Sequence, residues 1–412
     1  MAIKDIKEPS VSQWRKDFPI LQSSVHGKPL VYFDNGASTQ KPACTIKKLK
    51  EFDSQSYANI HRGVHELSAS ATEEYEEVRK QVQHLIHASS EKEIVFTRGT
   101  TESINLVAYS WGETNIKQGD EIIITLMEHH SNIVPWQMLC ERKGAVLKAL
   151  SVNEIGELDL DEFKSSITPR TKLLALTHIS NTLGTINPVQ KFIEIAKSNH
   201  ITVLLDGAQA ISHKEIDVQE LDCDFYAFSA HKLFGPTGVG ILYGKKSILD
   251  LMPPWHGGGD MIKNVSIEKT TYAETPSKFE AGTPNISGVI ALGASIKYLN
   301  SFNIQLRMKQ ESDLLEYGTI RLKEIKGLKI YGESKHKICT FSFLVDGTHP
   351  YDIGVLLDKQ GIAVRIGNHC TEPLMTHYNV PGTIRASLSF YNTKEEIDQF
   401  IKALDFSVNM LR

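Results

Sequence analysis

The sequence predicts an α/β protein with a large, mostly parallel sheet and a second, smaller α+β domain. Short apolar runs alternate with helical patterns through the middle of the chain. Several of these runs are apolar at successive positions, as strands are when helices cover both faces of a parallel sheet. The pattern changes near residue 295, where a long helical stretch is followed by further strand-like runs.

The individual elements follow from periodicity and capping signals. The clearest helix covers residues 70–87, because Ser70 and Glu73 have capping-box spacing and apolar side chains recur on one face. The large sheet is predicted to have seven strands: residues 94–97, 122–126, 146–150, 173–177, 203–206, 225–228 and 239–243. In the smaller domain we predict helices over 302–326, 352–360 and 394–411, and strands over 328–331, 340–345, 362–366 and 385–390. We therefore assign residues 21–294 to the large domain, and residues 295–412 with 1–20 to the smaller one.

Composition excludes several classes of protein. The net charge is -4, so neither nucleic acid nor an acidic membrane surface is expected as a partner. The first ten residues lack an apolar signal core, and no apolar run is long enough to span a membrane. The five cysteines are scattered without a CxxC pair, which favours reduced thiols and a cytoplasmic location. His129 with His130 could be a metal-binding pair, and His61 with His65 could supply further ligands. No HExxH motif or carboxylate-spaced cluster supports this alternative, so we expect no metal.

Two residues at predicted strand ends carry the main chemical signal. Asp206 ends the strand at 203–206, and Lys232 follows the strand at 225–228. Each has an ordinary explanation, a turn or capping aspartate and an exposed lysine. Together, at the carboxyl edge of one sheet, they suit a carboxylate that keeps a pyridinium nitrogen protonated and an amine that bonds covalently to a cofactor carbonyl. Ser229 and His231 beside the lysine are potential phosphate donors.

Other strand ends add polar groups at the same edge. Thr100 and Thr101 follow the strand at 94–97 and open a helical pattern, so they either cap that helix or help to bind a phosphate there. His129 follows the strand at 122–126 and could stack on a flat ring and relay protons. Asn181 follows the strand at 173–177, where an ordinary turn asparagine is an equally good explanation.

A polar loop in the smaller domain holds the most reactive candidate cysteine. Cys370 is preceded by Arg365 and His369, and we expect these two side chains to favour the thiolate. A buried, inert cysteine is the usual alternative. Arg385 is either a bidentate clamp for a carboxylate or an ordinary arginine at a sheet edge.

Taken in order, the motifs of the chain resemble those of group II, SufS-type cysteine desulfurases. The shared motifs are YANIHRGVH at 57–65, RGTTE at 98–102, MEHHSNIVPW at 127–136, DGAQ at 206–209, SAHKLFGPTG at 229–238, PPWHGGG at 253–259, FEAGTP at 279–284 and RIGNHC at 365–370. The likeness covers nearly the whole length. It implies the aspartate-aminotransferase fold, which is fold type I of the pyridoxal 5'-phosphate (PLP) enzymes, and a homodimer with sites at the subunit interface.

The resemblance also implies a role for each candidate residue. Lys232 binds PLP covalently and shuttles the Cα proton, while Cys370 accepts sulfur as a persulfide and His129 supplies a proton. The expected cofactor contacts are Thr100, Thr101, His129, Asp206, Gln209, Ser229, His231 and Lys232, with Thr283 reaching across from a second subunit. The expected substrate contacts are Asn181, Arg365 and Arg385. The substrate is L-cysteine or L-selenocysteine, and a SufE- or SufU-type protein accepts the sulfur for iron–sulfur cluster assembly.

Two positions depart from the usual motifs, and two other functions stay open. Asn368 stands where the group II signature usually has histidine, and Ala230 stands where the lysine motif usually has glycine. The first change puts the anchoring of the Cys370 loop in question. The alternatives to a cysteine desulfurase are a selenocysteine lyase and a non-catalytic scaffold for sulfur transfer, although the presence of Lys232, Asp206 and Cys370 together argues against the scaffold.

Overall fold

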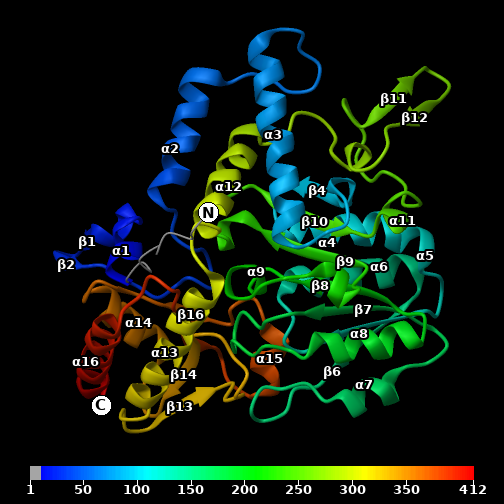
Figure 1. Ribbon diagram of the computed structural model, residues 1–412. Coiled ribbons are helices and arrows are strands. Elements are labelled where there is room, and N and C mark those ends of the chain that lie inside the picture. Colours follow the sequence, from blue (N-terminus) through cyan, green and yellow to red (C-terminus); the bar gives the residue numbers. More distant parts are fainter. Residues whose placement is uncertain (1–10) are drawn as a thin grey trace, which may run out of the picture.

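The large sheet lies at the centre of the molecule (Figure 1). The structure is a computed structural model that describes residues 11–412. Seven strands follow the order β4 (Ile94–Thr97), β10 (Gly240–Gly244), β9 (Phe225–Ser229), β8 (Thr202–Asp206), β7 (Thr171–Thr177), β5 (Glu121–Thr125) and β6 (Val146–Leu150). Only β10 is antiparallel to its neighbours within this sheet. The prediction of a mostly parallel seven-stranded sheet is confirmed.

Helices pack on both faces of this sheet because its strands are apolar on both sides. In β8, Val203 and Leu205 belong to one buried cluster, and Leu204 between them belongs to the other. The first cluster includes buried side chains of α3 (Glu66–Leu85), α8 (Val189–Ser198) and α12 (Ile286–Leu299). The second includes those of α4 (Thr100–Val107) and α6 (Val134–Lys143). Because successive side chains of a strand point to opposite faces, each cluster lies on one face of the sheet together with the helices that pack there.

A smaller antiparallel sheet forms the second unit, which lies at the lower left of Figure 1. Its strands follow the order β13 (Leu328–Tyr331), β14 (Thr340–Val345), β17 (Thr383–Ser387) and β16 (Arg365–Gly367). The helices α13 (Ile304–Leu322), α14 (Pro350–Asp358) and α16 (Lys394–Leu411) contribute buried side chains to its core. The predicted boundary between the domains stays a prediction, and residues 1–10 of the segment assigned to the smaller domain lie outside the described residues.

Several predicted elements differ from the structure in their bounds; the helix expected at 302–326, for example, is α13 and ends at Leu322. Helix α3 begins at Glu66 because His65 caps it, with Nδ1 accepting from the Ser68 amide at 3.3 Å; the expected cap at Ser70 is therefore wrong. The single strand expected at 362–366 is two strands, since β15 (Ile362–Ala363) pairs with β3 (Val31–Tyr32) and β16 pairs with β17. The last strand covers 383–387 rather than 385–390.

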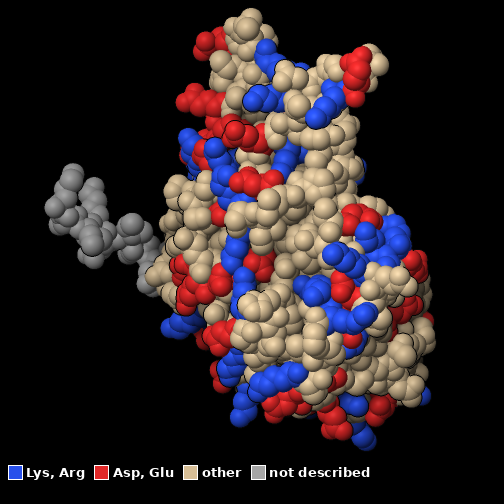
Figure 2. Space-filling view, turned by 90° about the vertical axis from the view of Figure 1, so that its right-hand side faces the viewer, with Lys and Arg blue, Asp and Glu red and all other residues tan. Residues whose placement is uncertain are grey.

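The remaining elements are short connections and surface additions. They are α1 (Val11–Lys16), β1 (Ser24–Val25), β2 (Lys28–Pro29), α2 (Ala43–Glu51), α5 (Glu113–Asn115), α7 (Leu160–Ser166), α9 (Ala210–His213), α10 (Val218–Leu221), α11 (Lys246–Leu249), β11 (Ile262–Val265), β12 (Thr270–Tyr272) and α15 (Glu372–His377). The β11–β12 hairpin extends away from the large sheet (Figure 1). Between residues 11 and 412, none of the helices combines the length and apolar character that a membrane crossing needs. On the face shown in Figure 2, charges of both signs are interspersed.

Candidate active site

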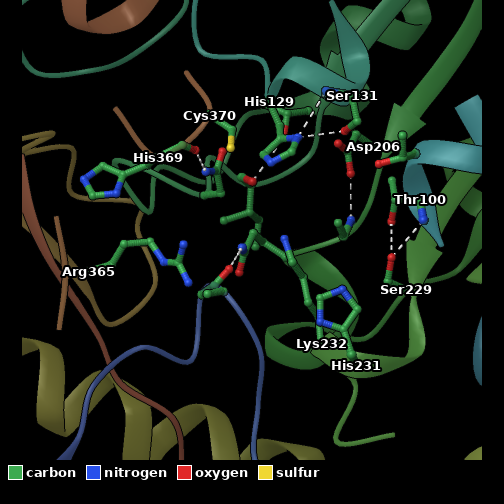
Figure 3. Close-up of a pocket in the computed structure, with 18 of the residues that line it drawn as sticks. Thr100, His129, Ser131, Asp206, Ser229, His231, Lys232, Arg365, His369 and Cys370 are labelled. Carbon is green, nitrogen blue, oxygen red and sulfur yellow. Dashed lines mark hydrogen bonds between the residues drawn. The ribbon is translucent and has the colours of Figure 1, made fainter. Parts of the chain in front are cut away.

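One pocket collects residues from the ends of five large-sheet strands and from a loop of the smaller unit (Figure 3). Parallel strands end at the same edge of a sheet, so turns far apart in sequence meet there. The predicted site residues that line the pocket are Thr100, Thr101, His129, Asn181, Asp206, Gln209, Ser229, His231, Lys232, Arg365, Cys370 and Arg385. Thr283 does not reach it and lines a separate pocket beside Arg98 and Trp255.

Asp206 is a buried carboxylate at the end of β8. Its Oδ1 accepts a hydrogen bond from the Ala208 amide at 2.9 Å. Burial raises its pKa, and the Ala208 amide and the charge of Lys232 oppose that effect. The tight turn that follows requires Gly207, because a Cβ there would lie 2.0 Å from the Tyr226 ring. The Asp206 carboxylate lines the pocket, where it could pair with a cationic ring nitrogen of a bound ligand.

Lys232 ends a single 3₁₀ turn, Ala230–Lys232, directly after β9. Thr39 braces this turn, since its Oγ1 donates to the His231 carbonyl at 3.1 Å and accepts from the Phe234 amide at 2.8 Å. Burial lowers the pKa of Lys232 to about 8, although Asp206 acts in the opposite direction. Although the amine is mostly protonated at pH 7, it loses its proton more readily than an exposed lysine, which favours its use as a nucleophile and base.

The start of α4 is a candidate anion-binding corner. The Ser229 hydroxyl accepts from the Thr100 amide at 2.8 Å and lies 2.7 Å from the Thr100 hydroxyl. Gly240 allows this approach, because a Cβ there would lie 2.3 Å from Gly99 main-chain atoms. Helix amide groups and two hydroxyls at one point suit a phosphate. Burial and the nearby charge of Lys232 lower the pKa of the neighbouring His231 to about 4, so its ring is neutral at pH 7.

His129 lies over the pocket as a neutral imidazole. Its Nδ1 accepts from the Ser131 amide at 3.1 Å, which leaves the ring proton on Nε2. Burial, with the charge of Lys232, lowers its pKa to about 3. Sequence reasoning missed its neighbour Glu128, a fully buried carboxyl group whose pKa burial raises to about 8. Glu128 accepts from the Thr177 amide at 3.0 Å and so ties the ends of β5 and β7 together.

Two arginines share one carboxylate at the opposite side of the pocket. Arg365 makes two contacts with Asp34, Nε to Oδ1 at 3.1 Å and NH2 to Oδ2 at 3.0 Å. Arg385 is buried, places NH2 3.3 Å from Oδ1 of Asp34, and donates from NH1 to the Asn181 carbonyl at 2.9 Å. Sequence reasoning missed Asp34, although it too follows a short apolar run. Paired guanidinium groups at this position can bind a substrate carboxylate.

Cys370 is exposed and borders the same pocket. The expectation that His369 favours the thiolate by its charge is wrong. Burial, then Arg385 and Arg365, lower the pKa of His369 to about 3, and its Nε2 lies 2.8 Å from the Thr383 hydroxyl. In Figure 3 the His369 ring points away from the thiol. Of the two predicted neighbours, only Arg365 brings a positive charge.

These residues fit PLP by their own chemistry. The cofactor needs an amine for its aldehyde, a carboxylate for its ring nitrogen and donors for its phosphate. The pocket offers a partly buried lysine with a lowered pKa, a buried carboxylate, and a corner of amide and hydroxyl groups. Gln209 adds a buried amide that donates to the Gly36 carbonyl at 2.7 Å. Among the described residues, no group of three or more metal-ligating side chains is found.

Comparison with known proteins agrees with this arrangement. Residues 31–400 match the family model "Aminotransferase class-V". A cysteine desulfurase of Escherichia coli O8 (strain IAI1) is 50% identical over 396 residues, covering 96% of this chain and 97% of the relative. A cysteine desulfurase of Synechococcus elongatus is 48% identical over 394 residues; the alignment covers 96% of this chain but only 63% of that longer relative.

Solved structures of cysteine desulfurases are also similar to this chain. The apo structure of a cysteine desulfurase from Thermococcus onnurineus NA1 superposes with a TM-score of 0.92 at 38% identity, covering all of both chains. The cysteine desulfurase CsdA from Escherichia coli gives 0.91 at 39% identity, covering 98% of this chain and 100% of that one. The fold and the site thus define a PLP-dependent enzyme of the class V aminotransferase type, with fold type I. Within that class the chain belongs to the cysteine desulfurase family.

Proposed function

We propose that this enzyme removes sulfur from L-cysteine, releases L-alanine, and holds the sulfur as a persulfide on Cys370. The observation that carries the proposal is that an exposed thiol borders the same pocket as Lys232 and the buried carboxylate of Asp206. The other four cysteines do not line this pocket. The reaction needs a nucleophilic sulfur where the carbon chemistry occurs, and Cys370 supplies it.

Each residue then has a proposed task. Lys232 attaches the cofactor and removes the Cα proton of the substrate, and Arg385 with Arg365 binds the substrate carboxylate. Bound PLP supplies an electron sink for the negative charge that develops at Cα. The Cys370 sulfur attacks the substrate sulfur: the S–S bond forms, the substrate Cβ–S bond breaks, and its electron pair stays with the carbon skeleton. His129, held by Ser131 with its proton on Nε2, is the proposed proton donor, and protonation of the carbon skeleton completes alanine.

The remaining contacts and partners are part of the same proposal. Thr100, Thr101, Ser229 and His231 bind the phosphate, Asp206 pairs with the ring nitrogen, Gln209 contacts the ring hydroxyl, and His129 stacks on the ring. We propose a homodimer in which Thr283 completes the phosphate site of the other subunit. The persulfide passes to a small SufE- or SufU-type acceptor protein for iron–sulfur cluster assembly.

Replacement of the nucleophile tests the proposal directly. Cys370→Ser keeps the size of the side chain but removes the soft nucleophile, so PLP and cysteine should still bind while alanine formation from cysteine is lost. Mass spectrometry of the wild-type protein after incubation with cysteine should find the added sulfur on the Cys370 peptide. Sulfur on another cysteine, or normal turnover by the serine variant, would show that the assignment is wrong.

A further inference from the structure

Cys370 lies in a tight turn whose main-chain conformation ordinary side chains rarely adopt. The Asn368 carbonyl accepts from the Thr371 amide at 2.9 Å, which closes a four-residue turn. The two residues between them, His369 and Cys370, both have positive φ angles, 53° and 58°. Positive φ at both central positions is typical of a type I′ turn, in which glycine, asparagine and aspartate are favoured. Histidine and cysteine are not favoured there, so neighbouring bonds have to hold the turn.

The Asn368 side chain supplies one of these bonds at the thiol residue itself. Its Oδ1 accepts from the Cys370 amide, two residues along the chain, at 3.1 Å, as in an Asx turn. The Asn368 carbonyl also accepts from the Thr371 hydroxyl at 2.8 Å. Thr371 is buried, and its hydroxyl lies 2.9 Å from that of Thr182 in the large-sheet unit. Asn368 therefore connects the amide of the thiol residue to an end of the turn that is fixed in the core.

From these contacts we infer that Asn368 is a positioning residue for Cys370, which holds the thiol at the pocket through an acceptor that does not titrate. The inference rests on the proposed function, because it concerns the placement of the sulfur nucleophile. Without this acceptor the Cys370 amide can turn toward solvent, and the φ angle of Cys370 can relax to the negative values that cysteine prefers. The thiol then moves away from the substrate sulfur, while the arginines that bind the substrate carboxylate stay in place.

Histidine, the residue that the group II signature usually has at this position, can supply the same bond only while its ring is neutral. His129 shows the geometry in this structure, since its Nδ1 accepts from the Ser131 amide, also two residues along the chain, at 3.1 Å. A protonated imidazole has no acceptor left. With an ordinary pKa of about 6.5, a histidine at position 368 would release the Cys370 amide in mildly acidic solution. The carboxamide of Asn368 accepts at every pH.

Other charged and titratable groups surround the turn, and all of them are common to the wild type and the variants. They are Asp34 after β3, His129 and His130 after β5, Lys232 after β9, Arg365 of β16, Arg385 of β17, and His369 and Glu372 beside the thiol. The ratio of two rates at the same pH therefore isolates position 368. A protonated histidine there would by its charge favour the Cys370 thiolate and raise this ratio, whereas loss of the acceptor lowers it. The sign of the change separates positioning from electrostatic tuning.

The test compares alanine formation from L-cysteine by the wild-type holoenzyme and by Asn368→His across the pH range. We expect the ratio of kcat, variant to wild type, to be about 1 at pH 8 and to fall to about a tenth at pH 5.5, the neutral fraction of an ordinary imidazole. Asn199→His, at the exposed end of α8, is the matched control and should give a ratio that does not change with pH. A ratio for Asn368→His that stays level or rises as the pH falls would overturn the inference.

Neutral substitutions separate positioning from substrate binding. For Asn368→Ala at pH 8 we expect kcat to fall about tenfold, while KM for L-cysteine stays within about twofold. Asn368→Ser keeps a weaker acceptor in the same kind of turn, so its kcat should lie between those of the alanine variant and the wild type. A raised KM with an unchanged kcat in the alanine variant would contradict the assigned role.

A direct measurement of the turn keeps the test decisive if the alanine variant does not fold. Deuterium exchange at the Cys370 amide, followed by mass spectrometry, reports the bond to position 368 without any turnover. The rate in Asn368→His relative to the wild type should be near 1 at pH 8 and rise about fivefold at pH 5.5; no rise would overturn the inference. Absence of alanine formation by the wild-type enzyme would instead refute the proposed function, and the exchange rates would still report on the turn.

Discussion

Lys232 should destabilise the folded protein when the cofactor is absent. The side chain is partly buried at the pocket wall, and this burial lowers the pKa of Lys232 from the ordinary lysine value of 10.5 to about 8, which corresponds to a free-energy difference. At roughly 1.4 kcal/mol per pKa unit, burying the charge costs about 3 kcal/mol. Lys232→Met keeps the length of the side chain and removes the charge. We therefore expect the apo variant to be more stable than the apo wild type by up to about 3 kcal/mol at pH 7.

The pH dependence of this difference follows from proton linkage. Below pH 8 both the folded and the unfolded state carry the proton, so the whole penalty is present. Between pH 8 and 10.5 the folded state has lost the proton while the unfolded state keeps it, so the stability of the wild type rises with pH. The advantage of Lys232→Met should accordingly shrink as the pH approaches 10.

Urea denaturation of the apo proteins at pH 7 and pH 10 measures both quantities. Lys191→Met, at an exposed position of α8, is the matched control and should change the midpoint little. A Lys232→Met protein that is no more stable than the wild type at pH 7 would refute the reasoning. So would a stability advantage of the same size at both pH values.

Three further predictions concern the charged groups of the site and the assembly. Asp206→Asn keeps the acceptor for the Ala208 amide but removes the negative charge, so we expect PLP to remain bound while turnover falls about a hundredfold or more; alanine formation near the wild-type rate would contradict this. Asp34→Asn removes the carboxylate shared by Arg365 and Arg385, and KM for L-cysteine should rise about tenfold with no change in the cofactor spectrum; initial rates decide the point, and an unchanged KM would exclude the proposed role. Light scattering at micromolar concentration should give the mass of a dimer, and a fully active monomer would contradict the role proposed for Thr283.

The sequence predicted the secondary structure best where the local pattern of apolar and polar residues matches the place of the segment in the fold. The strands of the large sheet were predictable because long apolar runs end in polar turns, and Asp206 and Lys232 were found because they stand at such ends. The start of α3 was not predictable in this way. Histidine is an unusual N-cap, whereas Ser70 and Glu73 have the spacing of a capping box, which is the commoner signal for a helix start. The strand at 362–366 was expected to be continuous because nothing in its composition marks the change of partner at Val364.

The protonation states of the site residues were harder to predict than which residues line the pocket. His369 is next to Cys370 in sequence, and proximity suggested a charged neighbour. The folded chain buries the ring against Thr383 and near two arginines, so it is neutral. Asp34 lies more than three hundred residues from the arginines it contacts, and no local pattern connects them. Long-range pairing of this kind is set by tertiary packing and cannot be read from neighbouring residues.

The pairing of β3 with β15 has a consequence for synthesis of the chain. Residues 31 and 32 leave the ribosome early, but their partners at 362 and 363 follow more than three hundred residues later. Contacts of such long range close late in folding, because the loop between them must be ordered first. Asp34 and its two arginines therefore meet only when translation is nearly finished. A chain that ends before residue 365 lacks Arg365, Cys370 and Arg385, so it has no completed pocket.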